Sequence, residues 1–348
     1  MLDLTTASAL RIGKVRTGGA RTGGVRRGGV RRGMACALAL ALSSAAAAAK
    51  DYPSKPVAVI VPFAAGGTAD ALGRVYAERL SQRLGKTFVI ENRAGAGGNV
   101  GVAATARAVP DGYTLGVASV TIAINPHVYR EKMPFDPVKD LQPLHLMATQ
   151  PNLLVVHPSI PAKTVAELVA YVKANPGKES FASSGVGTSL HLCMELLMAQ
   201  TGISLPHVVY RASNQVMQDV VAGQVRIACD NASSAVPQVK AGTVRGIGVS
   251  SLSRLEELPD LPAIAESLPG FEALTWFGFV APVGLPQPVA ARLVAELKAI
   301  SAEPAVQERM VALSSVPSRL AGDEFAAFIR SELAKWGPVV EKAGIKQP

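Results

Sequence analysis

The sequence has few of the residues and motifs that metal, nucleotide and nucleophile chemistry require. Its 348 residues include three cysteines and five histidines, and no Cys-x-x-Cys or His-Glu-x-x-His motif joins them. We therefore expect neither a metal site nor a cofactor. A complete P-loop sequence and a Gly-x-Ser-x-Gly nucleophile elbow are also missing. These absences argue against a P-loop nucleotide-binding protein and against a hydrolase with an activated serine.

Long apolar runs are missing as well, so no later segment is long enough to predict a membrane span. Near the N-terminus, Arg31-Arg32 precedes a short apolar run at 35–42 and small residues at 43–49. This pattern is typical of an export signal and predicts a periplasmic protein cleaved near Ala49. Met34 is an alternative start to Met1.

Excess charge is confined to the N-terminal tail. The formal net charge is +9, of which residues 1–33 carry +7 and the remainder only +2. The Gly/Arg-rich tail could instead be an RNA-binding arm. The export signal that follows it argues against this alternative. The balanced remainder gives no electrostatic reason to expect a nucleic-acid partner.

The cysteines left after cleavage are Cys193 and Cys229. They could form a disulfide in an oxidising compartment. We favour two buried free thiols, because Cys193 lies on an apolar helical stripe.

Candidate strands and helices alternate along the chain, which predicts an α/β fold with largely parallel sheets. The chain that remains after cleavage near Ala49 is long enough for two such domains. Two segments, near 150–153 and 275–278, have the character of crossings between domains. We therefore predict a first, discontinuous domain from 50–150 and 277–348 and a second domain from 151–276, with 1–49 as tail and signal. The strands are expected at 57–61, 87–91, 113–118, 153–156, 207–209, 226–229, 244–249 and 277–281.

The most informative segment is residues 57–70, in which a valine-rich strand leads into a Gly-rich loop and then a helix, which we expect to run from about Thr68 to Leu84. Glycines let backbone N–H groups approach a ligand, and the helix N-terminus adds unpaired donors and partial positive charge. Such a junction can hold a carboxylate or a phosphate. A second junction occurs at 183–189, and together the two predict opposite walls of an anion-holding cleft.

Some residues near these junctions have two possible roles. Asp70 either contacts the ligand or complements the dipole of its own helix. His191 either contacts the ligand or ties down its loop. Asp230-Asn231 follows a strand, where cleft residues of open α/β sheets are found. The segment 95–101 has a glycine pattern close to a dinucleotide fingerprint, but we interpret it as a helix-entry loop because Val100 occupies the third glycine position.

Taken together, these motifs resemble the substrate-binding proteins of tripartite tricarboxylate transporters, called the Bug family. The resemblance extends in order over nearly all of 50–348. The motifs are Tyr52-Pro53-Ser54-Lys55-Pro56, the loop 61–70, Glu91-Asn92-Arg93-Ala94-Gly95-Ala96-Gly97-Gly98-Asn99, Pro110-Asp111-Gly112-Tyr113-Thr114-Leu115, Ala123-Ile124-Asn125-Pro126, the stretches 183–185 and 188–192, Asp230-Asn231, Trp276-Phe277-Gly278 and Lys335-Trp336.

The resemblance implies a two-domain, type II-like periplasmic binding protein. Each domain would be a mostly parallel sheet flanked by helices, and the domains would close on a small mono- or dicarboxylate without catalysis. Membrane transporter subunits would be its partners, and we expect a monomer. The resemblance implies ligand-binding roles for Phe63, Ala64, Ala65, Gly66, Gly67, Thr68 and Asp70 in the first loop, Ser119, Thr121 and Asn152 beside the pocket, and Ser183, Ser184, Gly185, Thr188, His191, Asp230 and Asn231 in the second domain.

The chain departs from the family pattern in the 119–123 loop, where Val120 and Ile122 are more apolar than usual. This change suits an aromatic or aliphatic acid better than a densely charged tricarboxylate. Two other functions stay open at this level: a periplasmic sensor that presents its ligand to a membrane kinase, and an enzyme on the same scaffold. An enzyme would need an activated nucleophile or paired acid and base groups, which the sequence does not reveal.

Overall fold

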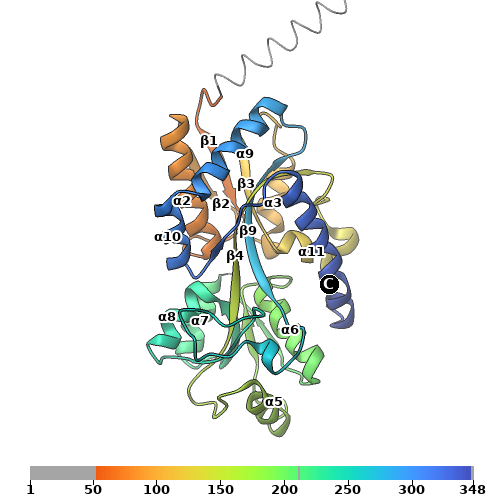
Figure 1. Ribbon diagram of the computed structural model, residues 1–348. Helices are drawn as coiled ribbons and strands as arrows, with labels where there is room; N and C mark the ends of the chain where they lie inside the picture. Colours follow the sequence, from red (N-terminus) through yellow and green to blue (C-terminus); the bar gives the residue numbers. More distant parts are fainter. Residues whose placement is uncertain (1–51, 211, 346–348) are drawn as a thin grey trace, which may run out of the picture. The chain divides into compact units, whose positions relative to one another are not determined.

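The computed structural model describes residues 52–210 and 212–345 (Figure 1). The predicted export signal, the basic tail and the choice between Met1 and Met34 lie outside the described residues. The strands are β1 (Val57–Val61), β2 (Phe88–Asn92), β3 (Thr114–Ser119), β4 (Leu141–Val156), β5 (Phe181–Ser183), β6 (His207–Val209), β7 (Ile227–Asn231), β8 (Arg245–Val249), β9 (Leu274–Pro282) and β10 (Val316–Pro317). The α-helices are α2 (Thr68–Leu84), α3 (Asn99–Ala106), α4 (Thr121–Tyr129), α5 (Val165–Ala174), α6 (Ser189–Thr201), α7 (Ser213–Val221), α8 (Ala232–Lys240), α9 (Gln287–Ser301), α10 (Pro304–Ala312) and α11 (Asp323–Lys342).

The strands form two sets that share the long strand β4, in the order β2-β1-β3-β9-β4-β7-β5-β6. The first part of β4 pairs with β9 and β10, and its last residues, from Asn152 to Val156, pair with β7 and β8. We call the elements around β1, β2, β3 and β9 the first half and those around β5, β6, β7 and β8 the second half. Figure 1 shows β4 and β9 running between the two halves.

Helices cover both faces of each strand set, so the predicted α/β class is confirmed. Parallel pairing links β1 with β2 and β3, and β5 with β6 and β7. However, β4 and β9 pair antiparallel with all of their neighbours. The expectation of mostly parallel sheets is corrected in this respect. The physical reason is that β4 and β9 pass between the halves in opposite directions. Each therefore lies antiparallel to the parallel strands that it joins, β9 next to β3 and β4 next to β7.

The local sequence explains the element that leads to the first loop. In β1, three β-branched valines and an isoleucine favour an extended, buried conformation, and four of the five residues are buried. Helix α2 spans Thr68–Leu84 as predicted and buries the stripe that includes Leu72, Tyr76 and Leu80. It ends at Gly85, which adopts the left-handed conformation common at helix C-termini. The sequence therefore aims the start of α2 at the end of β1.

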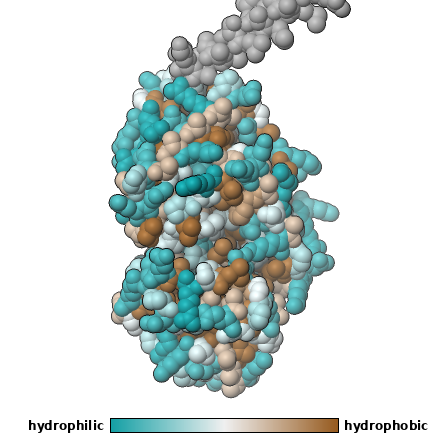
Figure 2. Space-filling view, in the orientation of Figure 1, coloured by the Kyte–Doolittle hydropathy of each residue, from teal (hydrophilic) through white to brown (hydrophobic). Residues whose placement is uncertain are grey.

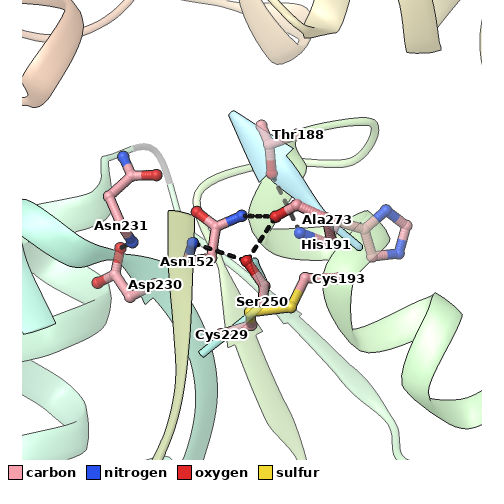
Figure 3. Close-up of a disulfide and its surroundings, with 9 residues drawn as sticks. All are labelled: Asn152, Thr188, His191, Cys193, Cys229, Asp230, Asn231, Ser250 and Ala273. Atoms are coloured by element: carbon pink, nitrogen blue, oxygen red, sulfur yellow. Dashed lines mark hydrogen bonds between the residues drawn. A yellow bond between two sulfur atoms is a disulfide. The ribbon is translucent and has the colours of Figure 1, made fainter. Parts of the chain in front are cut away.

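A disulfide joins Cys193 on α6 to Cys229 on β7, which corrects our expectation of two free thiols. Both side chains are buried, and their Cα atoms lie 6.2 Å apart. The apolar stripe of α6 did place Cys193 correctly in the interior. The same packing brings it against β7, so burial and disulfide formation are compatible here (Figure 3).

In the residues that the structure describes, no helix is long and apolar enough to cross a membrane.

Candidate functional site

A cavity lies between the two halves, at the ends of several strands. It contains about 550 Å³ of space not filled by protein atoms, part of it open to solvent. Figure 2 shows the surface narrowing between the halves, with apolar residues gathered there. The lining residues are Phe63, Ala64, Gly67, Thr68, Ala69, Ser119, Val120, Thr121, Ser184, Thr188, Ser189, Leu190, Ala212, Ser213, Asn231, Thr275 and Phe277.

Five described helices begin at this cavity: α2 and α4 from the first half, and α6, α7 and α8 from the second. The first turn of a helix has N–H groups without intrahelical partners and a partial positive charge. In α2, α4, α7 and α8 the side chain of the N-cap residue makes no cap hydrogen bond. Two first-turn donors have other partners: Thr121 N–H in α4 donates to Ser119 Oγ, and Gln215 N–H in α7 donates to Asn214 Oδ1. The first-turn donors without such partners are suited to an anion.

The side chains that line the cavity are uncharged. Hydroxyl groups come from both halves, and apolar walls are formed by Phe63, Val120, Leu190 and Phe277. Among the described residues, no lysine or arginine lines the cavity. Hydroxyls and backbone N–H groups can hold one or two carboxylates, while the apolar walls leave room for an uncharged body of the ligand.

One polar atom in the lining has no partner in the described structure. Asn231 is the N-cap residue of α8, its side chain makes no cap hydrogen bond, and its Oδ1 atom is buried and unpaired. Figure 3 shows the Asn231 amide pointing away from the neighbouring Asp230 carboxylate. A buried polar group without a partner is costly in free energy, so this amide is suited to a ligand that completes its hydrogen bonds.

The first loop is held from behind by Asp70. Its carboxylate accepts hydrogen bonds from the Gly66 N–H (3.0 Å), Arg74 Nε (3.0 Å) and Asn92 Nδ2 (2.9 Å). Burial raises the pKa of Asp70, but these hydrogen bonds outweigh burial and hold the pKa below its ordinary value. The structure therefore places Asp70 outside the lining, where it fixes the loop as an ionised group.

Gly66 and Gly67 serve different purposes in this loop. Gly66 has a φ of +87°, a conformation that other residues rarely adopt. Gly67 has an ordinary extended conformation and lines the cavity. A side chain at Gly67 would be tolerated by the backbone but would occupy the space in front of the first N–H groups of α2.

The second loop is held by two stacked imidazole rings. The rings of His191 and His207 lie 4.2 Å apart, and His207 Nε2 is 2.7 Å from Ser183 Oγ. His191 Nδ1 accepts a hydrogen bond from the Gly187 N–H at 3.2 Å, so its Nε2 proton is directed to Glu195 at 3.1 Å. Burial, reinforced by His191, lowers the pKa of His207 to about 3. The structure places His191 behind the loop that it ties down, not in the lining.

Asp230 and Asn152 also lie behind the cavity. Asp230 is fully buried, and its Oδ1 atom accepts hydrogen bonds from Ser213 Oγ and from the Asn231 N–H (2.7 Å). Asn152 donates from Nδ2 to the Ala273 carbonyl at 2.8 Å (Figure 3). It therefore supports the point at which β4 enters the second half.

The residues predicted to bind the ligand divide into two groups, according to whether they line the cavity. Those that line the cavity are Phe63, Ala64, Gly67, Thr68, Ser119, Thr121, Ser184, Thr188 and Asn231. Those outside the lining are Ala65, Gly66, Asp70, Asn152, Ser183, Gly185, His191 and Asp230. Sequence reasoning missed Ala69, Val120, Ser189, Leu190, Ala212, Ser213, Thr275 and Phe277 as lining residues. Ser213 had a recognisable signal, because it begins a helix directly after a predicted strand.

A hydrogen bond crosses the cavity between the halves. Thr68 Oγ1 at the start of α2 lies 2.7 Å from Ser233 Oγ near the start of α8. The two helix starts are therefore in contact in this structure. Within the described residues, no cluster of three or more histidine, cysteine or acidic side chains could hold a metal ion.

Comparisons with known proteins identify the family. Residues 72–345 match the family model described as the tripartite tricarboxylate transporter family receptor. The periplasmic binding protein BugD has a solved structure that is 36% identical, with a TM-score of 0.80, covering 85% of this chain and 100% of that one.

Two solved structures from Rhodopseudomonas palustris hold small acids. Rpa4515 with adipate is 33% identical, with a TM-score of 0.82, and covers 85% of this chain and 100% of that one. MatC with bound malate is 30% identical, with a TM-score of 0.79, and covers 83% of this chain and 100% of that one. These matches confirm the resemblance drawn from the motifs and the α/β fold class. The chain belongs to the receptor family of the tripartite tricarboxylate transporters, together with the Bug proteins.

Proposed function

We propose that this protein is a receptor that holds a small carboxylic acid in the cavity between its halves and delivers it to membrane transporter subunits. The observation that carries the proposal is the convergence of five described helix N-termini on one cavity, in four of which the N-cap side chain makes no cap hydrogen bond. Charge-assisted hydrogen bonds from such donors can bind a carboxylate without a lysine or arginine.

The ligand is a mono- or dicarboxylate with an aliphatic or aromatic body. Val120, Leu190 and the two phenylalanines of the lining would pack against that body, and the hydroxyls would hold its polar ends. A densely charged tricarboxylate would leave charges against these apolar walls, which costs free energy. The adipate and malate held by the two R. palustris proteins support this class of ligand.

Binding is coupled to closure of two domains, one made of 50–150 and 277–348 and the other of 151–276. The strands β4 and β9 would supply the hinge, since they run between the halves. The hydrogen bond between Thr68 and Ser233 would form only on closure. A ligand that contacts both halves then shifts the population toward the closed form.

The receptor acts as an exported monomer and leaves its ligand chemically unchanged. Export would use the signal at about 31–49, with the mature chain beginning near Lys50. N-terminal sequencing of the periplasmic fraction checks the cleavage site, and chromatography of a long incubation with bound acid checks that the acid is recovered intact.

A thermal-shift screen of small mono-, di- and tricarboxylates tests the proposal. An acid at one hundred times its dissociation constant stabilises the folded state by about 2.7 kcal/mol and so raises the melting temperature. Small-angle scattering of the same sample should show a smaller radius of gyration. If no acid in the panel stabilises the protein, the receptor proposal is wrong. If stabilisation occurs without compaction, binding stands and hinge closure does not.

A further inference from the structure

The carboxyl group of Asp230 lies directly behind two residues of the cavity lining. Its Oδ1 atom accepts hydrogen bonds from Ser213 Oγ and the Asn231 N–H, and both of these residues line the cavity. Its Oδ2 atom is buried and has no hydrogen-bond partner among the described residues. Figure 3 shows the carboxyl beneath Asn231 at the end of β7. A charge on Asp230 would therefore be felt in the cavity.

The polar groups that act on Asp230 are uncharged. They are the hydroxyls of Ser213 and Ser234 and the N–H of Asn231. The ionisable groups on neighbouring helices have other partners: His191 pairs with Glu195 on α6, and Asp219 on α7 accepts from Tyr210.

Three further ionisable groups lie on the surrounding elements. Lys240 stands in the last turn of α8, at the end remote from Asp230. His207, on β6, bonds to Ser183, and Asp70, across the cavity on α2, is paired with Arg74. Among the described residues no cation acts on Asp230, and burial raises the pKa of its carboxyl to about 7.

The geometry sets a conflict between Asp230 and an anionic ligand. While Asp230 is ionised, the Ser213 hydroxyl gives its only proton to Oδ1 and can offer only lone pairs to the cavity. A bound carboxylate would then face those lone pairs and a second negative charge behind them. Two carboxylates in one poorly solvated region cannot both remain ionised without a large energetic cost.

We propose that the cavity binds its carboxylate ligand together with one proton, and that Asp230 takes up this proton from solvent. No covalent bond changes; a proton moves from water or buffer to the Asp230 carboxylate as the ligand anion enters. Protonation removes the charge behind the lining and frees Ser213 to turn its hydroxyl toward the ligand. Asp230 is thus a positioning residue, which acts on the ligand through Ser213. The inference rests on the proposed receptor function.

Asp70 shows that this behaviour is specific to Asp230. Both carboxyls are buried behind loops of the same cavity. Asp70 accepts hydrogen bonds from the guanidinium of Arg74 and from two further donors, and therefore stays ionised. Asp230 has two serine hydroxyls and one backbone N–H, and among the described residues no cation acts on it. Only the second carboxyl has a protonation state that a bound anion could change near neutral pH.

The proposal predicts how affinity depends on pH. With a pKa near 7, about half of the empty receptor is protonated at pH 7, so binding takes up about half a proton per site. Above pH 7 the uptake approaches one proton, and the dissociation constant rises toward tenfold per pH unit. Between about pH 5.5 and 6.5 the affinity should vary little, because Asp230 is already protonated and the ligand is still ionised.

Isothermal titration calorimetry with adipate, malate and benzoate as probes tests this proposal. Each titration is run at pH 6, 7 and 8 in imidazole and in Bis-Tris propane, which buffer over this range without being anions and whose different ionisation enthalpies report the number of protons taken up. Asp230→Asn should show no proton uptake and an affinity independent of pH over this range. Asp136→Asn, the same change in a surface loop remote from the cavity, should behave like the wild-type protein.

A second variant covers the case in which Asp230→Asn does not fold. Ser213→Ala removes a hydrogen bond that lowers the pKa of Asp230, so the onset of weaker binding should move to higher pH. Binding of a probe without proton uptake, or uptake that persists in folded Asp230→Asn, overturns this inference and leaves the receptor function intact. Failure of all three probes to bind overturns the receptor function and this inference together.

Discussion

Replacing Ser233 by alanine should weaken ligand binding, although Ser233 is not part of the cavity lining. Its hydroxyl lies 2.7 Å from Thr68 Oγ1 and joins the start of α8 to the start of α2. These helices belong to different halves of the molecule, so under the proposed hinge closure the bond exists only in the closed form. Its loss should destabilise the closed form and leave each half unchanged.

The size of the effect follows from the kind of bond. A hydrogen bond between two neutral hydroxyls contributes about 0.5–1.5 kcal/mol net. This range corresponds to about a 2- to 13-fold change in the ratio of closed to open molecules. If the ligand binds only the closed form, and that form is the minor one in the free protein, the dissociation constant rises by the same factor.

Calorimetry with the acid that gives the largest thermal shift measures this change. Ser331→Ala serves as the control, because its hydroxyl bonds only to the Phe328 carbonyl on the exposed side of α11. In a Thr68→Val background, Ser233→Ala should have no further effect on affinity, because the bond is already lost. Small-angle scattering of the ligand-free variants should show a larger mean radius of gyration.

Two results would refute this reasoning. Wild-type affinity in a folded Ser233→Ala variant would mean that the bond does not stabilise the binding-competent form. An equal loss of affinity on Ser233→Ala in the wild-type and Thr68→Val backgrounds would mean that Ser233 acts through some other contact. The first result would remove the bond from the mechanism, and the second would reassign its partner.

Three further predictions concern the loop, the disulfide and a buried histidine. Gly67→Val should fold, because the backbone at Gly67 is extended and only the Ala64 carbonyl lies within 4 Å of the new Cβ. The new side chain should block hydrogen bonds from the start of α2 to the ligand, and each lost charge-assisted bond should weaken binding about tenfold or more; unchanged affinity by calorimetry would contradict this. Reduction of the Cys193–Cys229 disulfide opens a link across 36 residues and should lower the free energy of unfolding by about 4 kcal/mol in the chain-entropy model. Urea unfolding with and without reductant measures this change, and coincident curves after verified reduction would count against it. Burial lowers the pKa of His145 to about 4. The contribution of neutral His145 to the free energy of unfolding is therefore present above pH 6.5 and is lost as pH falls toward 4, by up to about 1.4 kcal/mol per pH unit. Urea unfolding at pH 5 and 7 should show this loss in the wild-type protein and less of it in His145→Leu.

Much of the first half of the cavity could be predicted from local sequence. The strand at 57–61, the Gly-rich loop and the helix Thr68–Leu84 have the bounds that the pattern of valines, glycines and apolar residues indicated. Such features depend on neighbours a few residues apart, so a one-dimensional pattern contains them.

Strand pairing was less accessible. The segment 153–156 read as a short strand, but β4 begins at Leu141 and spans 16 residues, with prolines at 143 and 151 that argue against a strand on local grounds. Its partners lie more than a hundred residues away in β9, and long-range pairing overrides local preference. For the same reason the antiparallel direction of β4 and β9 was not apparent.

The sequence by itself determined the chemistry available to this protein: small hydroxyl and glycine residues at strand-to-helix junctions, and few groups suited to metals or covalent catalysis. The tertiary structure decided how these junctions meet. It brings five helix starts to one cavity and turns Asp70 and His191 away from the lining to support the loops. It also joins Cys193 to Cys229 and buries Asp230 where, among the described residues, no cation acts on it. The physical reason is that these properties depend on distances between residues far apart in the chain, which the packing of the sheets and helices sets.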